Sequence, residues 1–163
     1  MGVGAKSEVL VIVPCGLSKI SDKNPNAGPT PAKDAYQGSP FKLNRQYAES
    51  FGNKWVILSA KYGFILPDFE IAGPYEVTFK RKASKPVTAN ILKRQILQLS
   101  LNSFDVLIGL GGKEYHEAMI ATFCDSNVHL QFSFAGLPIG KAMQATKRTI
   151  AESQSNSHVI RKA

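Results

Sequence analysis

Two short segments carry side chains suited to chemistry, and each directly follows a run of apolar residues. The first contains Cys15, Gly16 and Lys19. A cation near a cysteine favours the thiolate, so Cys15 is a candidate nucleophile. A lone cysteine is also commonly a small buried apolar residue, and this alternative stays open. Because the chain has only two cysteines and no C-x-x-C spacing, the sequence predicts neither a disulfide framework nor a metal site.

The second segment contains Ser59, Lys61, Tyr62 and Gly63 and leads to Asp68. Lys61 could bind a phosphate and Tyr62 could stack on a base, while Gly63 permits a positive φ angle. Asp68 is the best-placed carboxylate for acid–base catalysis. Since Asp68 follows a proline, it is equally typical of a turn.

Two glycine-containing segments, residues 109–113 and 136–141, each precede a predicted helix. Backbone N–H groups at a helix N-terminus can bind an anion, so each segment weakly indicates a phosphate or carboxylate site. Neither has the complete spacing of a dinucleotide-binding or Walker motif, so the sequence does not predict an ATPase. Close packing of a helix against the sheet is the competing interpretation. In the second segment the candidate ligand contacts are Gly136, Gly140 and Lys141.

The positive charge of the chain, +8 in total, is unevenly distributed. Residues 104–125 carry more acids than bases, whereas no acid interrupts the stretch from 80 to 94. Clustered basic side chains bind the nucleic-acid backbone by releasing counterions, and a solvated charged face is the alternative. The candidate nucleic-acid contacts are Lys80, Arg81, Lys82, Lys85, Lys93 and Arg94.

Apolar runs alternate with helical patterns along the chain. The runs are nearly continuous and rich in β-branched residues, which is typical of buried parallel strands. Strands are expected at residues 9–13, 55–58 and 104–110, with a short fourth at 128–132, and helices at 40–51, 86–101, 113–123 and 139–151. Ser39 is the expected N-cap of the first helix. This alternation predicts an α/β fold, a three-layer sandwich with a central, mostly parallel sheet.

Two segments rich in proline and glycine, residues 18–33 and 60–85, interrupt this pattern. Both follow an expected strand end, where open α/β sheets bind their ligands, and loops of this length are commonly functional or disordered. The sequence predicts one α/β domain over residues 1–152 and a polar, frayed tail over residues 153–163.

The composition narrows the class of protein. With 44% hydrophobic residues the chain can form a core, and no stretch approaches the roughly 18 apolar residues of a membrane span. The first residues show no export signal. We therefore expect a reduced, cytoplasmic protein that does not associate with membranes.

The order of these segments resembles a single protein family. The residues that carry the resemblance are Pro14-Cys15-Gly16 with Lys19, Ala35-Tyr36, Gly38-Ser39-Pro40-Phe41, residues 57–63, Pro67-Asp68, Ile71 with Pro74-Tyr75, and residues 136–141. Together they resemble an uncharacterised bacterial and phage family of unknown function that is related to the YaaA-type peroxide-stress proteins. More remotely, they are similar to the uracil-DNA-glycosylase group. The water-activating segments of true uracil-DNA glycosylases have no match here, so uracil excision is not implied.

The resemblance implies a uracil-DNA-glycosylase-like α/β fold with a strand-end pocket for a nucleobase or nucleotide. It also implies an association with nucleic acid, most simply DNA. These implications rest on analogy between folds. The candidate contacts of this pocket are Gly16, Lys19, Ser39, Phe41, Ser59, Lys61, Tyr62, Gly63, Tyr75, Gly136, Gly140 and Lys141.

These observations lead to three hypotheses about function. The first is a nucleobase- or nucleotide-binding protein, and within it an enzyme acting on an N-glycosidic bond or a modified base. Asp68 would then supply the carboxylate and Cys15 an alternative nucleophile, with no metal or organic cofactor. The second is a non-catalytic DNA-binding protein of the YaaA-like stress-response type that uses the basic stretch. The third is a small-nucleotide-binding module with no role on nucleic acid.

Overall fold

The structure of the chain is a computed structural model. The structure describes residues 7–16, 19, 24, 26, 28–73 and 75–162, and side chains up to residue 155. Pro74 and much of the segment 18–27, which the sequence analysis expected to be a loop, lie outside the described residues. Within the described residues, no helix is both long and apolar enough to span a membrane.

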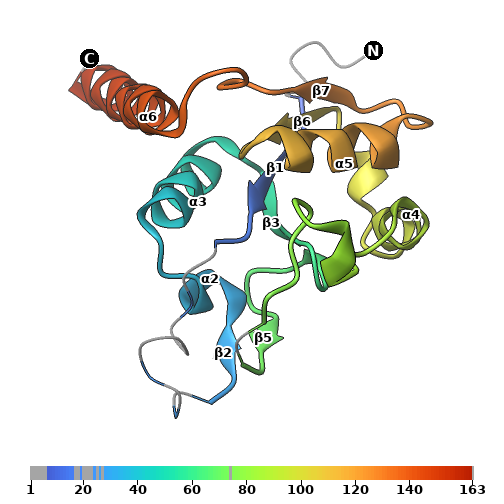
Figure 1. Ribbon diagram of the computed structural model, residues 1–163. Helices are drawn as coiled ribbons and strands as arrows, with labels where there is room; N and C mark the ends of the chain where they lie inside the picture. Colours follow the sequence, from blue (N-terminus) through green and yellow to red (C-terminus); the bar gives the residue numbers. More distant parts are fainter. Residues whose placement is uncertain are drawn as a thin grey trace.

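A five-stranded sheet forms the centre of the molecule (Figure 1). Its strand order is β4-β3-β1-β6-β7, and β4 alone runs antiparallel to its neighbour. The strands are β1 (Val9–Pro14), β3 (Lys54–Ser59), β4 (Gly63–Ile65), β6 (Val106–Gly109) and β7 (His129–Gln131). The prediction of an α/β fold with a central, mostly parallel sheet is confirmed.

Helices cover both faces of this sheet (Figure 1). One face is covered by α3 (Ser39–Phe51) and α6 (Ile139–Lys162), the other by α4 (Ala89–Gln98) and α5 (Lys113–Phe123). Residues of β1 alternate between the two cores: Val11 and Val13 face α3, while Ile12 packs against α4 and α5. Because both faces are covered, the central strand β1 is apolar along its whole length. The arrangement is consistent with a three-layer sandwich.

The helix boundaries differ in part from those expected. Gly38, rather than Ser39, is the N-cap of α3, because Ser39 already has helical geometry and Pro40 occupies the first turn. The α5 helix begins and ends where the sequence predicts. The α6 helix continues to Lys162, through residues expected to form a frayed tail, because no glycine or proline interrupts the chain after Gly140.

The two segments expected to be long loops contain short elements. In the first, β2 (Thr30–Pro31) is followed by α2 (Ala32–Ala35). In the second, β4 is followed by β5 (Glu70–Ile71) and the 3-10 turn η1 (Lys82–Ser84). The β2 and β5 strands pair with each other, below the main sheet in Figure 1. Strands of two or three residues are too short to show a periodic pattern, so the sequence analysis missed them.

Candidate functional site

The carboxyl ends of β1 and β3 lie side by side and form one edge of the candidate site. Pro14 is paired with Leu58, and the backbone N–H of Cys15 donates to the Leu58 carbonyl at 3.0 Å. Cys15 and Ser59 therefore leave the sheet at the same edge. Parallel pairing of two consecutive βα units places both strand ends there, as the sequence analysis expected.

A distant segment, residues 75–87, crosses this edge. The Val87 N–H donates to the Ala60 carbonyl at 2.8 Å, directly after β3. At the other end of the segment, the Tyr75 hydroxyl lies 3.0 Å from Ser59 Oγ. Between them, the Phe79 ring contacts the edge of the Tyr115 ring at 5.4 Å between centroids. The segment that begins the basic stretch thus lies over the strand ends.

Three hydroxyl groups form a hydrogen-bonded cluster at this edge. Ser59 Oγ accepts from the backbone N–H groups of Lys61 and Tyr62 at 3.2 and 3.1 Å. It also lies 3.0 Å from Tyr75 Oη, and either hydroxyl can donate in that pair. Tyr75 Oη in turn lies 2.5 Å from Tyr36 Oη. The three hydroxyls can therefore act as both donors and acceptors.

Burial keeps both phenols protonated. Removal from water raises the pKa of Tyr36 and of Tyr75 well above the ordinary value, and the nearby Cys15 adds to the effect. A phenol with a raised pKa is a hydrogen-bond donor at every physiological pH. The cluster therefore presents phenolic O–H groups rather than phenolates to a ligand.

Lys19 is held against Tyr75. Its side chain is only 5% exposed, and Nζ lies 4.2 Å from the centroid of the Tyr75 ring. The ammonium also donates to the Tyr75 backbone carbonyl at 3.3 Å. Lys19 pairs in a β-bridge with Tyr36, whose ring is 5.9 Å away. The tertiary structure thus places a cation, which ring faces attract, inside the hydroxyl cluster.

Cys15 lies at the rim of the same cluster. It is half-buried, and its Sγ is 3.4 Å from Tyr115 Oη. Burial raises the pKa of Tyr115, and the neighbouring Cys15 adds to that rise. Gly16 follows, also half-buried. The thiol is therefore near the polar groups, while its apolar surroundings also fit the structural interpretation of this cysteine.

An aromatic row continues outward from Tyr75. The Tyr62 ring contacts the Tyr75 ring edge-on at 5.5 Å between centroids, and the Phe69 ring at 5.2 Å. The exposed Lys61 places Nζ 5.1 Å from the Tyr62 centroid and 5.3 Å from that of Tyr75. Gly63 starts β4 with a φ of +79°, and Gln95 of α4 fills the space where a side chain would be.

Other candidates from the sequence lie apart from this cluster. The Asp68 side chain is 83% exposed and forms an ion pair with Lys33 of α2, with Nζ and Oδ1 3.2 Å apart. Phe41 is only 2% exposed and packs its ring on Tyr36, so it supports the cluster from the core. Ser39 lies two residues before Phe41, at the start of α3.

The two glycine-containing segments have different environments. A Cβ on Gly109 would meet Met119 and Phe132, and one on Gly111 would meet Pro14, which supports the packing interpretation. Gly136 and Gly140 instead face open space, and Lys141 is exposed at the first turn of α6. This segment, between β7 and α6, is well separated from α2, β2 and β5 in Figure 1.

The basic stretch divides into a loop and a helix. Lys80, Arg81, Lys82 and Lys85 are exposed on the crossing segment 75–87. Lys93 and Arg94 lie on α4, where Lys93 pairs with Asp125 at 3.7 Å. The structure therefore brings the four loop bases near the strand ends and leaves the helical pair elsewhere.

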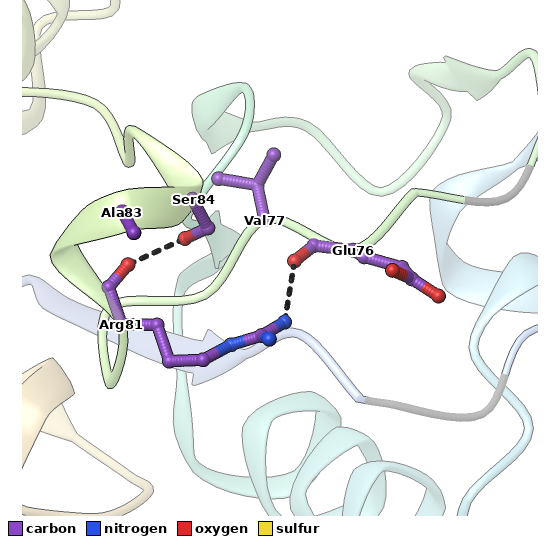
Figure 2. A pocket seen from close by; sticks show the side chains of 5 residues that line it. All are labelled: Glu76, Val77, Arg81, Ala83 and Ser84. Atoms are coloured by element: carbon purple, nitrogen blue, oxygen red, sulfur yellow. Dashed lines mark hydrogen bonds between the residues drawn. The ribbon is translucent and has the colours of Figure 1, made fainter.

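The loop is pinned by Ser84 and forms a hollow (Figure 2). Ser84 Oγ accepts from the Thr78 N–H at 3.0 Å and lies 2.6 Å from the Arg81 carbonyl oxygen. The Arg81 guanidinium donates to the Glu76 carbonyl at 3.4 Å. The hollow measures about 360 Å³ and is lined by Glu76, Val77, Arg81, Ala83 and Ser84. These bonds hold the basic side chains on an ordered loop beside Tyr75.

In the part of the chain that the structure describes, no group of three or more His, Cys, Asp or Glu side chains is arranged to bind a metal. Tyr115 and Phe69 are site residues that the sequence analysis did not select. Tyr36 appeared only among the residues of the resemblance. Nothing in the periodicity marks these three, because their proximity to the site depends on the path of the segments between strands.

The fold and the site define an α/β protein with a polar and aromatic cluster at the carboxyl edge of a mostly parallel sheet. The model of a family of unknown function, DUF6884, matches residues 10–148, and the chain belongs to this family. The chain is 38% identical over 144 residues to "Uncharacterized protein YfjM" of Bacillus subtilis (strain 168), covering 88% of this chain and 95% of the relative. No solved structure matches this chain. The expectation of an uncharacterised family is confirmed.

Proposed function

We propose that this protein binds a nucleobase or nucleotide at the carboxyl edge of β1 and β3. The observation that carries the proposal is the convergence of Lys19 and Ser59 on Tyr75, whose buried phenol keeps its hydrogen. A base offers ring nitrogens and carbonyl oxygens that accept such a hydrogen, and a flat face that stacks on an aromatic ring. The cluster supplies both types of contact.

Phosphate groups of the ligand would meet the basic side chains around the cluster. Lys61 is exposed beside Tyr62, and the four bases of the loop lie on the segment that crosses the site. Clustered cations attract phosphates through long-range electrostatics. The resemblance to YaaA-type proteins, and remotely to the uracil-DNA-glycosylase group, supports the same class of ligand. The free thiols of Cys15 and Cys124 fit a reduced, cytoplasmic setting.

Action on an N-glycosidic bond or a modified base is the catalytic extension of this proposal. It requires a group that stabilises developing positive charge or attacks the sugar. Asp68 is exposed and paired with Lys33, whereas Cys15 lies in the cluster, 3.4 Å from Tyr115. The geometry therefore supports Cys15 better than Asp68 as a reacting group. It supports ligand binding better than catalysis by either residue.

Titration calorimetry with nucleosides, nucleoside monophosphates and short oligonucleotides tests the proposal. We expect a nucleotide to bind the native protein, and Lys61→Ala to weaken binding of phosphorylated ligands more than that of nucleosides. Lys147→Ala is the matched control, because it removes the same charge from an exposed position on α6. If no member of the panel binds even at low salt, the proposal is wrong.

A second candidate function is non-catalytic DNA binding. It is favoured by the exposure of Lys80, Arg81 and Lys82 on an ordered loop. In this case the triple substitution of these residues by Ala should greatly weaken duplex binding and flatten the salt dependence of what remains. Cys15→Ala and Asp68→Asn should leave duplex binding unchanged. Loss of binding in the latter two variants would argue for the strand-end cluster instead.

A further inference from the structure

We propose that the ligand is single-stranded nucleic acid, whose unpaired bases stack on the outer, accessible part of a row made by Phe69, Tyr62 and the largely covered Tyr75. This inference rests on the proposed function and names the substrate class of the same site. It adds Phe69, which neither the sequence nor the hydroxyl cluster singled out. The row starts at the buried hydroxyl cluster and ends at the surface of the turn after β4.

Phe69 is presented to solvent on a fixed backbone. Its side chain is 41% exposed, which is unusual for a phenylalanine with a core nearby. The Phe69 N–H donates to the Leu66 carbonyl at 3.0 Å, and the Phe69 carbonyl accepts from the Ala32 N–H at 2.7 Å. The turn is thus bonded both to itself and to α2. A rigid, exposed aromatic ring loses little conformational entropy when a base stacks on it.

The neighbouring rings continue the surface inward. Phe69 and Tyr62 lie 5.2 Å apart between centroids with their planes tilted by 57°, and Tyr75 follows at 5.5 Å from Tyr62. Tyr62 is half-buried, so one part of its ring is covered while another is accessible. A row of successive rings suits successive bases of one strand rather than a single free base.

Basic side chains lie near the inner part of the row, whereas the turn that carries Phe69 also carries acids. Lys61 is exposed above Tyr62 and Tyr75. Phe69 stands between the exposed Asp68, which pairs with Lys33, and the exposed Glu70. Beyond Tyr75, the ordered loop carries its four exposed bases. Stacking platforms flanked by basic side chains are the arrangement by which proteins hold single strands without reading sequence.

A site that binds base faces should prefer single-stranded to double-stranded nucleic acid. In a duplex each base face is covered by its neighbours, and only edges and phosphates are accessible. Protruding aromatic rings therefore gain nothing from an intact duplex, whereas a single strand offers its faces. The basic loop alone would not discriminate between the two, since both carry phosphates.

Fluorescence anisotropy of the full chain with a labelled 20-nucleotide single strand and with the duplex of the same sequence tests this inference. We expect the single strand to bind more tightly. Phe69→Ala should weaken single-strand binding about tenfold, the effect of losing one stacked base, without changing the slope of affinity against salt. Phe69→Trp should retain binding. Leu97→Ala, an exposed apolar position on α4, is the matched control and should have no effect.

Two results would overturn the inference. One is duplex binding as tight as single-strand binding, and the other is single-strand binding by Phe69→Ala within twofold of the unsubstituted protein. If mononucleotides still bind and Lys61→Ala still weakens them, the inference fails while the proposed function stands. If neither strand nor mononucleotide binds at low salt, both fail together.

Discussion

The Nζ atom of Lys19 lies 4.2 Å from the centre of the Tyr75 ring and donates to the backbone carbonyl of the same residue. The contact joins the segment after β1 to the segment that crosses the strand ends. A buried cation that contacts both the ring and the backbone of Tyr75 ties Lys19 to the crossing segment. The candidate site depends on this contact for its geometry.

Lys19→Met should therefore destabilise the protein. We expect a loss of about 1–3 kcal/mol in the free energy of unfolding, because the substitution removes a charge-assisted hydrogen bond and a cation–π contact at a buried position. Urea denaturation measures it. Lys141→Met, which removes a lysine from an exposed position, should stay within about 0.5 kcal/mol of the parent. Equal stability of the two variants would show that the Lys19 contact contributes little.

Tyr75→Phe should lower the free energy of unfolding by a similar amount, because it removes a hydroxyl from the hydrogen-bonded cluster. It removes the hydroxyl that lies within hydrogen-bond distance of both Ser59 and Tyr36, a loss of about 1–3 kcal/mol in the free energy of unfolding. The double variant Tyr36→Phe/Tyr75→Phe should lose less than the sum of the two single losses, because one broken bond is then counted once. Additive losses by denaturation would contradict a coupled cluster.

His116 predicts a stability that depends on pH. Its ring stacks on Phe132 at 4.3 Å, and Nε2 is buried with no hydrogen-bond partner among the described residues. Burial lowers the pKa of His116 below its ordinary value of 6.5. The unfolded chain then binds a proton more readily than the folded one, so stability present above about pH 6.5 should be lost as the pH falls through the lowered pKa.

Denaturation curves recorded between pH 7.5 and about 4.5 measure this effect. His116→Leu should flatten the acid side of the stability profile, whereas His129→Gln, at an exposed position of β7, should leave it unchanged. A profile for His116→Leu that parallels that of the parent protein would rule out His116 as its source.

Gly63→Ala should destabilise the protein by more than about 1 kcal/mol. The position has a φ of +79°, and a Cβ there would run into the Gln95 side chain, which accepts from the Phe64 N–H at 2.8 Å. Gly140→Ala makes the same change in the first turn of α6, where a Cβ meets nothing within 4 Å, and should stabilise by about 0.4–1 kcal/mol. Thermal unfolding of the two variants should shift in opposite directions, and a shift in the same direction would contradict this account.

The sequence by itself determined the α/β class, the mostly parallel sheet and the edge at which the site lies. Burial on two faces demands continuous apolar strands such as β1, and parallel strands end at a common edge, so both features follow from local composition. Cys15, Lys19 and Ser59 could be predicted as candidate residues because they lie at or just after the expected strand ends. Their functional roles stay predictions.

Only the tertiary structure decided which residues from distant segments meet at the strand ends. Tyr36, Ser59 and Tyr75 are far apart in the chain, and their hydroxyls meet because segments without any periodicity fold back over the strand ends. The same path exposes Phe69 and draws Asp68 to Lys33. Periodicity reports which face of an element is buried, but the route of an irregular segment is set by contacts between distant residues, which a local pattern does not encode.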